Sequence, residues 1–186
     1  MNKFLSDKNK IKLISLATYQ IGGGIFGIII TIQLLLDAEE IKGLVVFLIL
    51  IALGLFAFSI YCGLCLIKNK LHRGLKLSTI NQAIQTISFT MFGYGYKFCS
   101  GIFLYLGVDL TNAFNVSFKL RLSNWYFIIN SDKEVLTVGI NIVAFYLLYF
   151  ISKLEGEIEV DRKLFETSEQ VNSPTDASLK QSNERT

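Results

Sequence analysis

The stretch "NAFNVSFKLRLSNWYFIIN", residues 112–130, alternates apolar and polar side chains in a chain that is otherwise dominated by long apolar runs. From residue 114 to residue 123 the alternation is unbroken, and a period of two is that of a β-strand rather than of a helix. Ser123 and Asn124, at the end of this alternation, are compatible with a tight turn. The sequence therefore predicts a strand or a hairpin within 114–129. Its apolar side consists of Phe114, Val116, Phe118, Leu120 and Leu122.

This apolar stripe needs a cover, because an isolated hairpin is only marginally stable in water. The stripe is a candidate interface or partner strand with three possible covers. It can lie on the membrane interface, where Trp125 and Tyr126 suit the aromatic belt. It can pack on the outer ends of the chain's own helices. It can also offer its edge to another chain, because unpaired strand edges recruit strands.

The composition indicates a membrane protein. Hydrophobic residues make up 52% of the chain and charged residues only 18%, whereas soluble domains carry about 25% charged residues. Residues 13–36 and 43–67 contain no charge, and each run exceeds the ~20 apolar residues that cross a bilayer. One such run could be the core helix of a soluble protein, but two neighbouring runs favour membrane spans. The net charge of +3 is too small to indicate nucleic acid, so the expected partner is the lipid bilayer.

Two further segments, 85–108 and 135–152, complete the prediction of four spans. The expected fold is an all-α integral membrane protein, a four-helix transmembrane bundle over residues 1–153. The small β-element of 114–129 is expected outside the cytoplasm, between the third and fourth helices. Residues 154–186 contain few apolar side chains and are predicted to be a disordered cytoplasmic tail.

The lysines and arginines predict the orientation, because cytoplasmic loops carry an excess of them. More of them lie on the side of the two termini than on the opposite side, so both termini are expected in the cytoplasm. The apolar run after the basic N-terminus is too long for a signal-peptide core, and a multi-pass protein of a bacterial cytoplasmic membrane is expected. The terminal side has Lys3, Lys8, Lys10, Lys12, Lys68, Lys70, Arg73, Lys76, Lys153, Arg162 and Lys163; the other side has Lys42, Lys119, Arg121 and Lys133.

Lys97 is the one formal charge well inside a predicted span, where a lysine costs about 2.5–3.5 kcal/mol on insertion scales. On a helix, Thr86 and Thr90 share its side and Gln85 adjoins it, which makes a candidate polar membrane site. Asn141 of the fourth span is expected to hydrogen-bond to the third. Two interpretations remain open: a position that attracts anions or handles protons, or a lysine that extends to the membrane surface.

Gly23 and Gly27 have the G-x-x-x-G spacing that lets transmembrane helices approach closely, and they are predicted to pack against another helix. Cys62 and Cys65 have the C-x-x-C spacing, but no second pair or nearby histidine completes a metal site. We expect these cysteines to be packing residues and expect no metal.

The sequence contains no paired nucleophile and base and no cofactor motif, so neither catalysis nor a cofactor is expected. The leading hypothesis is a small polytopic membrane protein with a non-catalytic assembly or accessory role, as a homo-oligomer or with another membrane protein. The alternative is a small transporter or channel subunit with Lys97 in its path.

Overall fold

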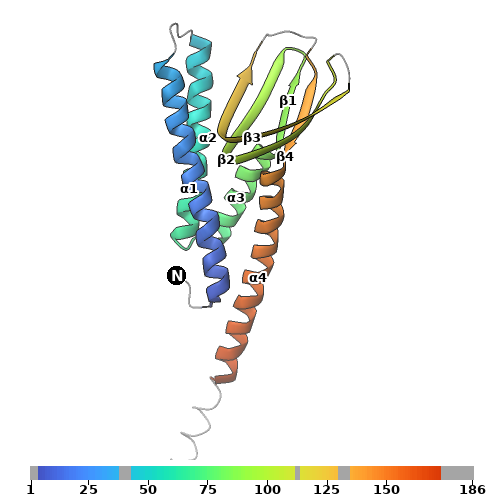
Figure 1. Ribbon diagram of the computed structural model, residues 1–186. Helices are drawn as coiled ribbons and strands as arrows, with labels where there is room; N and C mark the ends of the chain where they lie inside the picture. Colours follow the sequence, from blue (N-terminus) through green and yellow to red (C-terminus); the bar gives the residue numbers. More distant parts are fainter. Residues whose placement is uncertain (1–3, 38–42, 112–113, 130–134, 173–186) are drawn as a thin grey trace, which may run out of the picture.

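The computed structural model describes residues 4–37, 43–111, 114–129 and 135–172. Three helices precede a sheet of four strands, and a long helix follows it (Figure 1). The elements are α1 (Asp7–Leu36), α2 (Gly43–Ile67), α3 (Leu71–Thr86), β1 (Ile87–Met91), β2 (Tyr94–Asp109), β3 (Asn115–Ile128), β4 (Thr137–Asn141) and α4 (Ile142–Asn172).

The predicted four-helix transmembrane bundle is wrong. Among the described helices, only α1 and α2 are long and apolar enough to cross a membrane. The predicted third span, 85–108, is mostly the strands β1 and β2, and the predicted fourth span, 135–152, is divided between β4 and α4. The helix α3 ends at Thr86, where the β-branched and aromatic residues of "ISFTM" favour an extended backbone. High hydropathy over a long segment does not by itself distinguish a helix from a pair of strands.

Antiparallel pairing curls the sheet around its inner face. The strand order is β1-β4-β2-β3, and β1 also pairs with β2. The start of β2 pairs with β1, as in Tyr96 with Phe89, whereas its end pairs with β4, as in Gly107 with Gly139. Because β1 and β4 also pair with each other, β2 has to bend to close this ring of strands.

The alternating stretch of the sequence is β3, which runs without interruption from Asn115 to Ile128. Of the two forms predicted within 114–129, the strand is confirmed and the hairpin is wrong, because β3 continues through Ser123 and pairs with β2 on both sides of it. The register shifts between Cys99 and Ile102 of β2. At this bulge Gly101 has a φ of 114°, a conformation that glycine adopts readily.

The bulge attaches the sheet to α1. The Ser123 hydroxyl donates a hydrogen bond to the Gly23 carbonyl at 2.9 Å and accepts one from the Gly101 N–H at 2.9 Å. Farther along α1, the Trp125 indole N–H donates to the Thr31 hydroxyl at 2.9 Å. The sheet therefore lies beside the upper parts of α1 and α2 in Figure 1.

The first turns of α4 follow directly from β4, and the helix continues to Asn172. Leu154 and Ile158 are buried in a core shared with α1 and α3. Asp161 accepts hydrogen bonds from the Ser6 N–H and the Asn9 amide, both at 2.9 Å. These contacts hold the part of α4 up to Asp161 against the other helices. Residues 154–172 are helical rather than disordered, and the remainder of the expected tail, 173–186, lies outside the described residues.

Candidate functional site

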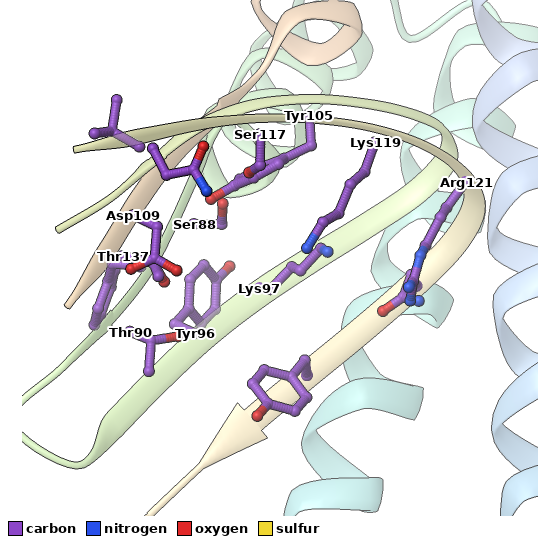
Figure 2. Close-up of a pocket in the computed structure, with 15 residues that line it drawn as sticks. Ser88, Thr90, Tyr96, Lys97, Tyr105, Asp109, Ser117, Lys119, Arg121 and Thr137 are labelled. Carbon is purple, nitrogen blue, oxygen red and sulfur yellow. The ribbon is translucent and has the colours of Figure 1, made fainter. Parts of the chain in front are cut away.

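A cavity of about 360 Å³ lies on the inner face of the curled sheet (Figure 2). All four strands contribute to it, and most of its side chains are polar, charged or aromatic. We call it the sheet pocket. It is lined by Ser88, Phe89, Thr90, Tyr96, Lys97, Tyr105, Val108, Asp109, Asn115, Ser117, Lys119, Arg121, Asn124, Tyr126 and Thr137.

Three cationic side chains converge in the sheet pocket: Lys97 from β2, and Lys119 and Arg121 from β3. Lys119 and Arg121 are two residues apart and therefore point to the same side of the sheet. Figure 2 shows these three side chains on one side of the pocket. The Lys97 ammonium lies over the Phe103 ring, 4.3 Å from its centroid, and 5.3 Å from that of Tyr105, a cation–π arrangement that holds the charge in place.

The three cations repel one another. Burial lowers the pKa of Lys97, and the charges of Arg121 and Lys119 lower it further. Within the described part of the chain, none of the three side chains forms a salt bridge. An anion placed among them would relieve this repulsion and would favour the charged form of Lys97.

The opposite side of the sheet pocket is polar and carries one acid. Asp109 accepts a hydrogen bond from the Thr111 N–H at 2.9 Å, and its hydrogen bonds with Thr111 hold the pKa of this carboxyl below its usual value. Figure 2 places Asp109 next to Thr137 and away from Arg121. The pocket therefore has a cationic side for an acidic group and a second side with hydroxyl and carboxylate oxygens.

The predicted polar membrane site does not form as one strip. Lys97 and Thr90 line the sheet pocket, whereas Gln85 and Thr86 are buried at the end of α3. Asn141 is buried at the end of β4, where it accepts from the Leu104 N–H at 3.3 Å and donates to the Cys99 sulfur at 3.4 Å. The spacing of a helix placed these residues together, but most of them lie on strands.

The two glycines of the predicted packing motif make different contacts. A Cβ on Gly27 would lie 2.0 Å from the Phe56 ring of α2, so this glycine permits close approach of the two helices. A Cβ on Gly23 would lie 2.6 Å from the backbone nitrogen of Gly101, so this glycine permits close approach of the sheet. Both positions are therefore occupied by contacts within the chain.

The apolar side chains of the predicted interface strand lie on the side of β3 opposite to the sheet pocket. The chain's own helices do not cover them. They remain between 56% and 75% exposed: Phe114, Val116, Phe118, Leu120 and Leu122.

Sequence reasoning missed the pocket, although it identified Lys97. The period of two in 114–123 predicts Lys119 and Arg121 on the polar face of a strand. The alternation correctly places these two side chains on one face. The segment that pairs with their strand is predicted as a helix, whereas in the structure it is the strand β2. A strand assignment for 94–109 would have brought Lys97 into the same sheet as both residues.

The chain was compared with models of known protein families, with curated proteins and with solved structures, and none of the three comparisons gave a match. Within the described ranges, no group of three or more His, Cys, Asp or Glu side chains is arranged to hold a metal ion. The charge and shape of the sheet pocket are therefore the features that point to a function.

Proposed function

We propose that this chain is an integral membrane protein that binds a small anionic molecule in the sheet pocket, in a non-catalytic accessory role. The convergence of Lys97, Lys119 and Arg121 in one cavity carries the proposal. Membrane anchoring by α1 and α2 and ligand binding by the sheet are two parts that can be tested separately.

The exposure of α1 and α2 supports membrane anchoring. Only 39% of the apolar window of α1 and 22% of that of α2 is buried. The core helix of a soluble protein would be mostly buried, because exposed apolar surface is unfavourable in water. Side chains such as Phe26 of α1 and Phe47 and Leu50 of α2 are instead exposed, as expected for helices that face lipid.

The basic side chains support an orientation. The start of α1, the end of α2 and the distal half of α4 lie at the same end of the molecule, away from the sheet (Figure 1). Lys8 and Lys10 lie at the start of α1, Lys68 and Lys70 directly follow α2, and Arg162 and Lys163 lie in the distal half of α4. By the positive-inside rule this end faces the cytoplasm, which suits a bacterial cytoplasmic membrane with both termini inside.

The dimensions and charge of the sheet pocket indicate its ligand. A volume of about 360 Å³ lies at the lower end of the ~300–1,000 Å³ range of small-molecule sites. Arginine and lysine side chains suit phosphate or carboxylate groups, and the hydroxyl groups of Thr90 and Thr137 can bind a polar remainder. The expected ligand is a small organic phosphate or carboxylate.

Calorimetric titration of the detergent-purified protein with inorganic phosphate and with glycerol 3-phosphate tests ligand binding. Charged hydrogen bonds contribute about 1.5–3 kcal/mol, so Arg121→Gln should weaken binding by about 10- to 100-fold. Lys68→Met is the matched control, because it removes a charge from an exposed side chain outside the pocket. Absence of binding, or an equal loss in both variants, would contradict an anion site in the pocket.

A small transporter is a second candidate, favoured by buried amides of α1 and α3, which lie where these helices meet α2. The side chains of Gln20, Asn81, Gln82 and Gln85 are at most 1% exposed, and each has a polar atom without a hydrogen-bond partner among the described residues. Buried polar atoms are usually paired, and polar side chains inside membranes often mark substrate paths.

Phosphate flux into proteoliposomes distinguishes the two roles. A transporter should lose flux on Gln82→Leu while phosphate binding in the sheet pocket is retained. A binding protein should show no flux above that of protein-free vesicles, with or without the substitution.

A further inference from the structure

We propose that the outer face of the sheet contacts lipid acyl chains directly, so that the curled sheet lies within the membrane beside α1 and encloses a polar pocket there. This inference rests on the proposed membrane anchoring by α1 and α2. It extends that proposal by assigning the bilayer, rather than water or a second protein, as the partner of the exposed apolar side of β3.

The attachment points on α1 set the depth of the sheet. Tyr19 accepts a hydrogen bond from the Ile102 N–H at 3.1 Å, and the bonds of Ser123 to Gly23 and of Trp125 to Thr31 follow along the helix. The α1 residues in these contacts all lie within the uncharged run 13–36. At ~1.5 Å per residue they span about 18 Å, more than half of the ~30 Å hydrocarbon core.

The two faces of the sheet have opposite chemistry. Ser117, Lys119 and Arg121 face the sheet pocket, whereas Phe118 and Leu120 between them are 64% and 68% exposed. An inner polar face and an outer apolar face are the pattern of transmembrane β-barrels and the reverse of a soluble sheet. The exposed apolar side chains of the outer face are Ile87, Ile102, Leu106, Val116, Phe118, Leu120, Leu122, Val138 and Ile140.

The outer face continues into neighbouring apolar surfaces. Ile140 of β4 pairs with Leu106 of β2. The helix α4 begins two residues after Ile140, and its first turns carry the exposed side chains of Phe145 and Tyr149. The first charged side chain of α4 is Lys153. Exposed apolar surface of this extent is rare on soluble monomers, and its continuation into the first turns of α4 is consistent with a surface that faces lipid.

Backbone groups within a bilayer need hydrogen-bond partners, and the pairing of the sheet largely supplies them. In the described sheet, β1 and β4 each have two neighbours, β2 pairs with the three other strands, and β3 is the edge. Part of that edge, from Ser123 to Trp125, lies on α1. Residues 115–122 of this edge border the polar sheet pocket, and non-helical backbone is tolerated at membrane depth where it lines a hydrated cavity.

Spin labels on single cysteines test the inference in phosphatidylcholine vesicles. Labels on Phe118→Cys and Leu120→Cys report the outer face, and labels on Ser117→Cys and Lys119→Cys are matched controls on the same strand. Phe26→Cys and Leu50→Cys report the anchoring helices. The labelled parent chain corrects for its own three cysteines, which are all buried. Collisions with oxygen and with a water-soluble nickel chelate are measured by electron paramagnetic resonance.

We expect the ratio of oxygen to nickel collisions to be several-fold higher at 118 and 120 than at 117 and 119, and similar to that at 26 and 50. Nickel access at 118 and 120 with lipid exposure at 26 and 50 would overturn the inference but leave the anchor. Immobile labels at 118 and 120 without access to either reagent would also overturn it, because a protein surface would then cover the face. Nickel access at 26 and 50 would overturn the membrane anchor itself.

Discussion

Gly22 and Gly23 are adjacent in α1 and provide a matched test of how closely the sheet packs on the helix. A Cβ on Gly23 would lie 2.6 Å from the Gly101 nitrogen and 2.7 Å from the Ser100 carbonyl carbon, whereas a Cβ on Gly22 would have no atom within 4 Å. The atoms near Gly23 are backbone, so no side-chain rotation relieves the clash. Gly23→Ala should therefore destabilise the protein relative to Gly22→Ala.

The size of the difference follows from the contacts. Alanine improves helix propensity by up to about 1 kcal/mol over glycine, and this gain is common to both variants. Overpacking costs about 1–3 kcal/mol. A shift of the bulge also disturbs the bond from the Ser123 hydroxyl to the Gly23 carbonyl, which contributes about 1 kcal/mol. The free energy of unfolding should be about 2–4 kcal/mol lower for Gly23→Ala than for Gly22→Ala.

Unfolding in mixed micelles with increasing sodium dodecyl sulfate measures this difference. Trp125 is the only tryptophan, and its indole bonds to Thr31 of α1, so its fluorescence reports separation of the sheet from the helix. Equal unfolding midpoints for the two variants, or a more stable Gly23→Ala, would refute the close packing of the bulge on α1.

Two further predictions concern ionisable groups of β2. Because the pKa of Lys97 is lowered mainly by burial, affinity for sulfate, an anion of constant charge, should be full at low pH. The affinity should fall as the pH rises through the lowered pKa of Lys97, which lies below the pKa of an ordinary lysine. Lys97→Met should remove this step from a calorimetric pH series. An unchanged profile would contradict a role of Lys97 in anion binding. Burial also raises the pKa of the Cys99 thiol to about 12, so at neutral pH maleimide, which reacts with thiolate, should modify Cys99 only after unfolding. Mass spectrometry detects the adduct, and rapid labelling of the folded protein would contradict this burial.

Some features of the fold follow from local patterns in the sequence. The uncharged runs 13–36 and 43–67 correspond to most of α1 and to α2, because an apolar run of this length is too long for a typical strand and favours a helix. The period of two in 114–123 corresponds to β3. The local signal failed in 94–109, where both faces of β2 carry apolar or aromatic side chains. With the residues before it, β2 forms a segment, 85–108, that is long enough to be predicted as a membrane helix.

The sequence by itself determined the apolar character of α1 and α2, the location of β3, and that Lys119 and Arg121 share one face. Only the tertiary structure decided that Lys97 joins them, because this requires the pairing of β2 with β3 and the bend at Gly101. Pairing register is a long-range property: it depends on hydrogen bonds between segments that are far apart in the chain, which no local periodicity encodes. The sheet pocket exists because these distant strands close around it.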